Sequence, residues 1–210
     1  MVKAIIFDFW GTLVENGVWS PIKQVRKILN IEVPFSEYVV RMERAMMAGK
    51  NKTLREAFEK VCNEFRIKAD EQKIQDLIGM WNKSWMLARP YEEVESVLNG
   101  LNQKYTLILV SNTDPFSIDN VLEKFKLRDY FSHIFLSYNL GLLKTDEEFL
   151  RTALAKADLR PEDCILVGDS LQSDMLAAQN AGIKAILIDR KDRQDFKSKI
   201  LNLRELENEL

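Results

Sequence analysis

Six polar residues of this 210-residue chain stand directly after apolar runs of strand length, or a short turn beyond them. They are Asp8, Ser111, Asn112, Lys144, Asp169 and Asp174. A carboxylate at the end of a buried strand is costly unless a cation, a set of donors or an electrophile engages it. The carboxyl ends of the strands in an open α/β sheet border one crevice, so we expect these side chains to gather there.

The chemistry that these residue types support is phosphoryl transfer. Three acids in one crevice repel one another unless a cation is bound, and oxygen ligands with room for water suit Mg²⁺. Ser111 and the backbone N–H groups after it can donate to an oxyanion, while Lys144 supplies positive charge. A carboxylate that attacks phosphorus forms an aspartyl-phosphate. The residues therefore predict Mg²⁺-assisted transfer of a phosphoryl group to Asp8.

The elements that must position these residues alternate between strands and helices. Short apolar runs predict strands at 4–9, 106–111, 133–137, 164–167 and 185–188. Amphipathic patterns predict helices at 92–103, 119–125, 147–157 and 174–181, the last of which ends at Gly182. The fold class that follows is α/β, a doubly wound parallel sheet forming a Rossmann-like core.

The pattern changes between residues 14 and 90, where no strand-like run occurs. Helical periodicity covers 20–29, 36–47, 54–65 and 70–87, with a capping box formed by Thr53 and Glu56. We expect a Rossmann-like catalytic core of residues 1–14 and 91–210, and an all-helical cap domain of residues 15–90. The two connections, near Asn16 and near Arg89-Pro90, should lie close together and can act as hinges.

Composition and charge argue against several other classes. A formal net charge of −2 offers no general basic field for nucleic acid or a membrane surface, and the charged run 190–193 is expected to be a solvated face. Cys62 and Cys164 form no disulfide framework and are expected to be buried. Neither a signal peptide nor a membrane-spanning run is recognisable, so we expect a cytoplasmic monomer or homodimer that acts on a small phosphorylated molecule.

In their order and strand placement, the polar residues resemble the motifs of the haloacid dehalogenase-like hydrolase superfamily, in members with a helical cap between the first and second motifs. Residues 8–12, Asp-Phe-Trp-Gly-Thr, are similar to the first motif, Ser111-Asn112 to the second and Lys144 to the third. Gly168-Asp169-Ser170 with Asp174 is similar to the fourth. The resemblance covers nearly the whole chain.

The resemblance implies a role for each of these residues. Asp8 is the nucleophile, and Lys144 and Ser111 assist it. The groups that hold the transferring phosphoryl group are Thr12, Ser111, Asn112 and Lys144. The groups that bind Mg²⁺ are Asp8, Asp169, the main-chain carbonyl of Trp10 and, directly or through water, Asp174.

Trp10 departs from the pattern of the phosphatases that the chain resembles. Those enzymes carry a second Asp at this position as general acid and base, whereas 2-haloacid dehalogenases lack it and attack carbon without a metal. Asp169 and Asp174 favour a metal enzyme, and the Trp10 carbonyl remains available as a ligand. Dehalogenases also place an aromatic residue after the lysine where this chain has Leu150. We therefore expect a Mg²⁺-dependent phosphatase acting through an aspartyl-phosphate on Asp8.

Two alternatives remain open at this point. Trp10 favours either a metal-independent 2-haloacid dehalogenase or a catalytically impaired phosphate-binding module. Neither Arg41 nor Arg44 of the cap matches the carboxylate-binding arginine of the dehalogenases. The group that replaces the missing acid and base is also open. Glu15 is nearest in sequence, although a surface charge is slightly favoured there, and a cap residue or water is equally compatible.

Two further residue types invite a functional interpretation. His133, the single histidine, is expected to be structural because it begins a strand away from the motif ends. The Trp and Met residues of the cap are expected to form mainly its core, with Trp19 a candidate for lining the pocket.

Overall fold

In residues 2–210, the part of the chain that this computed structural model describes, six parallel strands form the central sheet. Their spatial order is β5-β4-β1-β6-β7-β8. Their bounds are β1 (Ala4–Phe7), β4 (Thr106–Ser111), β5 (His133–Leu136), β6 (Cys164–Gly168), β7 (Lys184–Ile188) and β8 (Lys199–Ile200). The predicted α/β fold class is confirmed. Of the six strands of this sheet, β8, which is two residues long, was not predicted from the sequence pattern.

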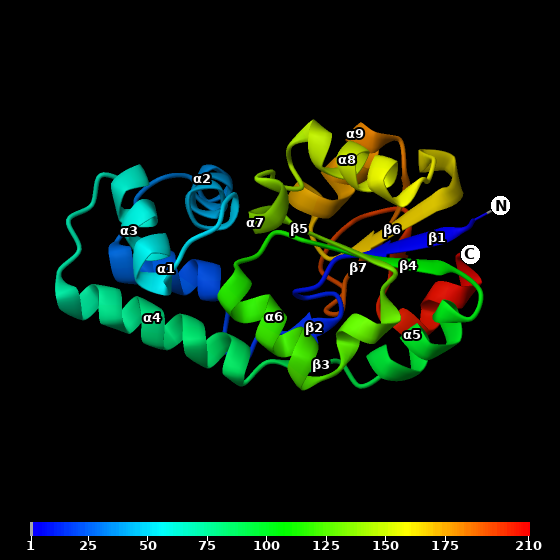
Figure 1. Cartoon of the computed structure of the whole chain (residues 1–210), viewed down its shortest axis with the longest axis horizontal. Helices are drawn as coiled ribbons and strands as arrows, with labels where there is room; N and C mark the ends of the chain where they lie inside the picture. The colour runs from blue at the N-terminus through cyan, green and yellow to red at the C-terminus, as the bar shows by residue number, and fades with distance from the viewer. Residues whose placement is uncertain (1) are drawn as a thin grey trace.

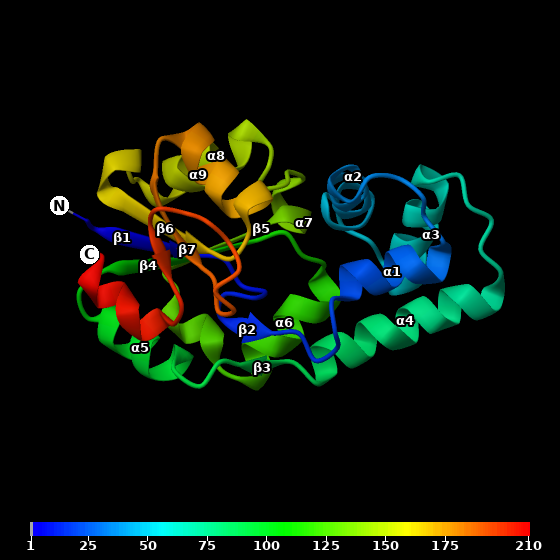
Figure 2. The same cartoon turned by 180° about the vertical axis from the view of Figure 1, so that it is seen from behind.

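Helices cover both faces of this sheet, so it is doubly wound. Successive side chains of a strand point to opposite faces, and in β1 Phe7 joins one apolar cluster whereas Ile6 joins the other. The face of Phe7 is covered by α5 (Val94–Asn102), α6 (Pro115–Lys124) and the short helix η4 (Leu203–Asn208). The face of Ile6 is covered by α8 (Glu147–Ala157) and α9 (Leu176–Ala181) (Figures 1 and 2).

The register of the three central strands brings their carboxyl ends to one place. Phe7 pairs with Leu109 of β4 on one side and with Val167 of β6 on the other. Asp8 and the residues that follow β4 and β6 therefore leave the sheet at nearly the same level. Because β1 lies where the chain switches from one half of the sheet to the other, this edge is the expected position of a ligand site.

Four helices form the cap beside this edge (Figure 1). They are α1 (Pro21–Leu29), α2 (Phe35–Met47), α3 (Leu54–Glu64) and α4 (Glu71–Met86). Their apolar faces enclose a core of their own, in which Tyr38, Met42 and Phe58 are fully buried. Thr53 caps α3 by accepting a hydrogen bond from the Glu56 N–H at 3.1 Å, as the sequence predicts.

The expectation that residues 14–90 contain no strand is wrong at both ends of that segment. Two short strands, β2 (Val14–Glu15) and β3 (Arg89–Pro90), form an antiparallel pair. Two residues are too few to show a period, so the pattern could not reveal them. The same pairing confirms that the two connections between core and cap lie side by side.

Local backbone chemistry explains the other shifts in element bounds. The helix predicted at 119–125 begins earlier, at Pro115, because Asp114 accepts hydrogen bonds from the N–H groups of Phe116 and Ser117. The strand predicted at 133–137 ends at Leu136, where the short helix α7 (Ser137–Leu140) begins. The helix predicted at 174–181 begins with a π-helical turn, η3 (Leu171–Met175), which continues into α9.

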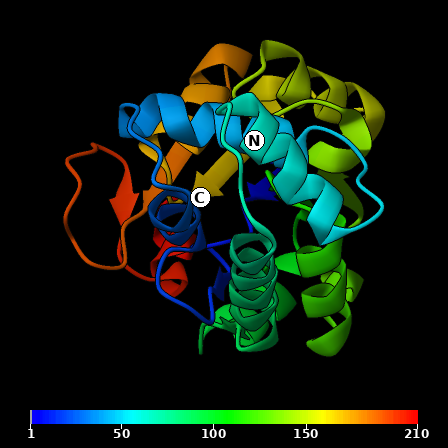
Figure 3. The ribbon, with the colours of Figure 1, turned by 90° about the vertical axis from the view of Figure 1, so that its left-hand side faces the viewer.

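The expectation that the run 190–193 is a solvated face is wrong for Arg190. Its guanidinium donates to the Thr12 carbonyl and to Glu93, each at 2.7 Å, and stacks 3.4 Å from the ring centroid of Tyr91. Arg190 belongs to the segment 189–198 between β7 and β8, and Figure 3 shows this orange segment as a loop that projects at one edge of the molecule. This arginine therefore supports the turn that carries Thr12.

Several smaller expectations can be compared with the fold. Cys62 and Cys164 are buried free thiols, as predicted. His133 stacks on Phe135 with ring centroids 6.0 Å apart and does not line the cavity that contains Asp169. Within residues 2–210, no helix combines the length and apolar character that crossing a bilayer requires.

Candidate active site

Asp8 lies immediately beyond β1, with its carboxylate buried among donors. Its N–H still donates to the Val167 carbonyl at 2.9 Å, so the backbone remains attached to the sheet. The Thr12 hydroxyl donates to Oδ2 at 3.0 Å, and the Lys144 ammonium lies 2.5 Å from Oδ1. Thr12 returns to Asp8 because Gly11 adopts a φ of +84°, a conformation that favours glycine.

Lys144 joins two of the three acids. Its Nζ lies 2.5 Å from Asp8 Oδ1 and 2.5 Å from Asp174 Oδ1, and all three side chains are buried. Burial favours the neutral amine, but the carboxylates of Asp174 and Asp8 outweigh it and raise the pKa of Lys144. The lysine is therefore a fixed positive charge beside Asp8.

The three acids converge as the sequence predicts. One oxygen from each of Asp8, Asp169 and Asp174 can be chosen so that all lie within 4.8 Å of one another. Two glycines make room for them, since a Cβ on Gly11 would lie 2.2 Å from Asp169 Oδ2 and one on Gly168 would lie 2.4 Å from Asp174 Oδ2. The absence of a side chain at Gly11 and Gly168 therefore lets Asp169 and Asp174 lie close to the backbone of these two turns.

The charges of this cluster do not balance. Among residues 2–210, Asp169 has no lysine or arginine within ion-pair distance, because the Lys144 ammonium pairs with Asp8 and Asp174 instead. Burial, followed by the charges of Asp8 and Asp174, raises the pKa of Asp169 well above its usual range. Burial also raises the pKa of Asp8 to about 6, against the opposing effect of Lys144. The hard oxygen donors and the uncompensated charge fit a divalent cation such as Mg²⁺.

This arrangement corrects one part of the sequence-based expectation. The acids are not held together by a metal alone, because Lys144 already neutralises part of their charge. A cation at this site would be held by carboxylates of Asp8, Asp169 and Asp174. That the Trp10 carbonyl also binds the metal stays a prediction.

Ser111 is the last residue of β4, and Asn112, which follows it, contacts the lysine of the same site. The buried Ser111 hydroxyl makes one long contact, 3.4 Å, with the Asn112 carbonyl, which leaves it able to donate to a ligand. Asn112 Oδ1 accepts from the Lys144 N–H at 2.8 Å, and its Nδ2 donates to Glu43 Oε2 at 2.9 Å. Asn112 thus links the second and third motifs to the cap.

Trp10 turns its side chain toward the cap and cannot exchange a proton. Its indole Nε1 donates to the Thr113 hydroxyl at 3.2 Å, and an indole N–H is a donor only. Glu15, the nearest acid in sequence, is exposed in β2 opposite Arg89 and does not line the site. Trp19 is 72% exposed and also lies outside the cavity, so the expectation that it lines the pocket is wrong.

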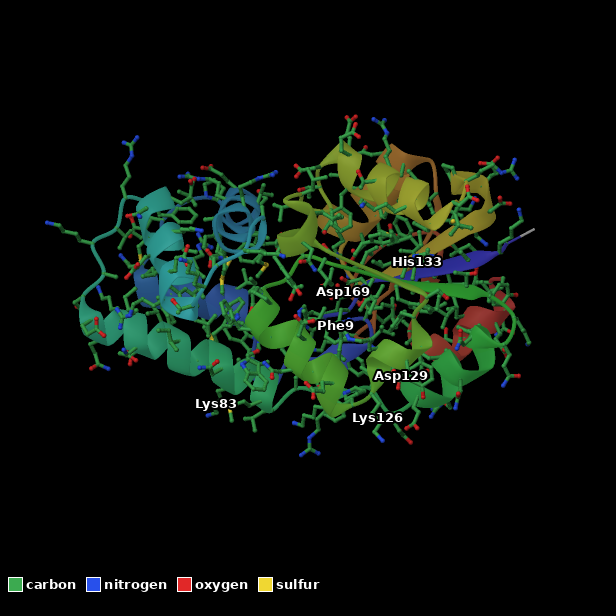
Figure 4. All side chains as sticks on the ribbon, in the orientation of Figure 1. Phe9, Lys83, Lys126, Asp129, His133 and Asp169 are labelled. Carbon is green, nitrogen blue, oxygen red and sulfur yellow. The ribbon has the colours of Figure 1, made fainter. Side chains whose placement is uncertain are left out.

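A cavity of about 470 Å³ opens between the cap and the strand ends. Its core side carries Asp8, Lys144, Asp169 and Asp174, and its cap side includes Ile22, Lys23, Phe35, Val39, Val40 and Glu43. Figure 4 shows Asp169 where the core meets the cap. The cap arginines are engaged elsewhere, Arg41 with Glu37 and Glu64, and Arg44 with Asp146.

Glu43 is the residue of this cavity that sequence reasoning did not identify. Burial raises its pKa to about 7, against the effects of the Asn112 hydrogen bond and of Lys144. A signal was present, because Glu43 lies one helical turn after Val39 and one before Met47, on the side of α2 that carries apolar residues. An acid on that side of a helix is unusual enough to mark a candidate site.

Comparisons with known proteins agree with this geometry. A sequence profile of haloacid dehalogenase-like hydrolases matches residues 2–182. The glyceraldehyde 3-phosphate phosphatase of Methanothermobacter thermautotrophicus is 25% identical over 197 residues, covering 90% of this chain and 86% of that protein. The phosphoserine phosphatase of Thermus thermophilus is 24% identical over 203 residues, covering 90% and 82%. The crystal structure of the Bacillus subtilis HAD-hydrolase YfnB bound to magnesium has a TM-score of 0.69 at 19% identity, covering 99% of this chain and 97% of that one. The chain belongs to the haloacid dehalogenase-like hydrolase family.

Proposed function

We propose that this protein is a Mg²⁺-dependent phosphatase that hydrolyses a small phosphorylated metabolite through an aspartyl-phosphate on Asp8. The observation that carries the proposal is the acidic cluster of Asp8, Asp169 and Asp174, in which the Lys144 ammonium pairs with Asp8 and Asp174 and, within the described residues, Asp169 has no ion-pair partner. The phosphatase activities of relatives that align along most of this chain support it. So does the magnesium in the YfnB structure, which shares the fold.

The reaction on Asp8 has two halves. In the first, a carboxylate oxygen of Asp8 bonds to phosphorus and the ester oxygen leaves with its electron pair. In the second, water attacks the same phosphorus, inorganic phosphate departs and the carboxylate is restored. Thr12 and Lys144 hold the two oxygens of Asp8 in place, and a pKa of about 6 leaves the carboxylate mainly ionised at neutral pH. Bound Mg²⁺ would supply positive charge to the phosphoryl oxygens.

The donors beyond β4 suit the phosphoryl group. Ser111 ends β4, the strand next to β1, and the Lys144 ammonium contacts Asp8, so we infer that both donate to oxygens that gain charge in the transition state. The apolar cap side of the cavity, with Ile22, Phe35 and Val39, excludes water from the reacting centre.

Dehalogenation fits the site less well. A haloacid carries a carboxylate, and in the described chain no arginine lines the cavity to bind it. Leu150 lies in α8, is buried in the core and does not line the cavity. A metal-free reaction would also leave Asp169 without a counter-charge.

The test is release of inorganic phosphate from p-nitrophenyl phosphate and from a panel of phosphorylated sugars, trioses and amino acids, with Mg²⁺ and with excess EDTA. Activity should require the metal and disappear in Asp8→Asn, whereas Asp129→Asn, an exposed acid (Figure 4), should match wild type. No phosphate release from any compound, or halide release from 2-chloropropionate in EDTA, would overturn the proposal.

A further inference from the structure

The proposed reaction lacks a proton-transfer group at position 10. The departing ester oxygen needs a proton, and the attacking water must lose one, but the Trp10 indole can do neither. Among residues 2–210, the ionisable side chains that line the cavity are, with one exception, the three acids of the cluster, Lys144, which pairs with two of them, and the surface lysine Lys23.

We propose that the exception, Glu43 of the cap helix α2, is the general acid and base of this site. The inference rests on the proposed phosphatase function and supplies the residue that the substitution at position 10 removes. It makes the cap a source of catalytic chemistry as well as a cover.

A hydrogen-bonded chain fixes Glu43 relative to the nucleophile. Glu43 Oε2 accepts from Asn112 Nδ2 at 2.9 Å, and Asn112 Oδ1 accepts from the backbone N–H of Lys144 at 2.8 Å. The side chain of the same lysine contacts Asp8. Within the described residues Glu43 Oε1 makes no hydrogen bond, so one carboxyl oxygen is held and the other is left for a ligand.

The position of Glu43 suits a leaving group. It lines the 470 Å³ cavity above Asp8 and also an adjoining apolar space of about 120 Å³ bounded by Trp81 and Trp85. The acids lie on the core side, so an ester bound with its phosphoryl group at Asp8 must direct its leaving group toward the cap. Glu43 stands where those two spaces meet.

The surrounding charges leave both protonation states of Glu43 accessible. The core presents Lys144, Asp174, Asp8 and Asp169, and α1 presents Lys23; the adjacent Arg44 is turned away and paired with Asp146. Burial and the core carboxylates raise the pKa of Glu43 to about 7, which is suited to an acid that must later act as a base near neutral pH.

The proton balance closes over one turnover. As the Asp8 oxygen bonds to phosphorus and the ester bond breaks, the Glu43 carboxyl gives its proton to the leaving oxygen. As water then attacks phosphorus, Glu43 takes a proton from it and the bond to Asp8 breaks. The products are an alcohol and inorganic phosphate, and Glu43 ends protonated as it began.

Glu43→Gln isolates proton transfer from positioning, because the Gln amide oxygen can still accept from Asn112. The matched control is Glu37→Gln, on the same helix but exposed and paired with Arg41. The probes are p-nitrophenyl, phenyl and p-methoxyphenyl phosphate, whose leaving groups need increasing help from an acid. We expect Glu43→Gln to lose about 10²–10⁴-fold in kcat/KM with p-methoxyphenyl phosphate, and far less with p-nitrophenyl phosphate.

Two further measurements sharpen the result. With p-nitrophenyl phosphate, Glu43→Gln should show a burst of nitrophenolate followed by slow turnover, because the phosphoenzyme forms but water is not activated. With p-methoxyphenyl phosphate we expect kcat/KM of the wild type to decline at alkaline pH, and we expect the variant to lose that decline. Equal losses with all three esters, or kinetics matching Glu37→Gln, would refute the role of Glu43. Inactivity of the wild type with every ester would instead refute the phosphatase function.

Discussion

Asp169→Asn should stabilise the metal-free protein while abolishing its activity. In the absence of a cation, Asp169 is a partly buried carboxylate beside Asp8 and Asp174, with no lysine or arginine in the described chain within ion-pair distance. Asparagine has nearly the same shape but no charge. The substitution therefore removes repulsion from the folded state and leaves the packing in place.

The magnitude can be scaled from Asp8, which lies in the same acidic cluster and is also affected by burial and by the charge of Asp174. Its pKa rises from 3.8 to about 6, and at about 1.4 kcal/mol per pKa unit the folded state loses about 3 kcal/mol when that carboxylate is ionised. Asp169 lacks the Lys144 contact that moderates this cost. Allowing for relaxation of the site, we expect Asp169→Asn to gain about 1–3 kcal/mol, with about 2–4 °C in Tm for each kcal/mol.

The assay is thermal unfolding at pH 7.5 in EDTA and again in MgCl₂. Without metal, Asp169→Asn should melt above wild type; with metal, the wild type should gain stability and the variant should not. Asp129→Asn, which removes an exposed charge, controls for net charge and should show neither effect. A variant that melts below wild type in EDTA would refute the account of uncompensated charge.

Three other perturbations probe the same cluster. Because the pKa of Asp8 is higher in the folded than in the unfolded state, the folded form binds protons more tightly, so stability in EDTA should rise as pH falls from about 7 to about 4. Denaturant titrations measure this, and Asp8→Asn should flatten the dependence. Lys144→Met should lose about 3–5 kcal/mol in EDTA by the same titration, since it leaves buried carboxylates without their ammonium; a loss near zero would contradict the contacts to Asp8 and Asp174. Gly168→Ala should weaken Mg²⁺ binding in calorimetry, because its Cβ would lie 2.4 Å from Asp174 Oδ2, and unchanged affinity would mean that the turn relaxes freely.

Much of this site could be predicted because its groups sit at the ends of short, strongly patterned strands. Asp8, Ser111 and Asp169 each follow an apolar run, and parallel strands bring such ends together whatever lies between them. The helical segment between the first two motifs was visible for the same reason, since a 3.6-residue period persists through each of its helices.

Side-chain contacts between segments far apart in the sequence could not be predicted in this way. Glu43 and Asn112 are 69 positions apart, and Thr12 and Arg190 are 178 apart. Glu15 was the nearer acid in sequence, yet the β2–β3 pair leaves it exposed opposite Arg89. Proximity in sequence carries no information about which acid enters a cavity between two packed units.

The sequence by itself determined which polar residues follow the strands, which acids meet there and that the cap is helical. The strands and helices follow from local periodicity, and the meeting of the acids follows from a general property of parallel sheets. Only the tertiary structure decided that Lys144 spans Asp8 and Asp174, that Arg190 supports the Thr12 turn and that Glu43 reaches the cavity. The first two outcomes depend on how loops far apart in the sequence pack together at the strand ends of the core, and the third on how the helices of the cap dock against the core. No local pattern encodes either arrangement.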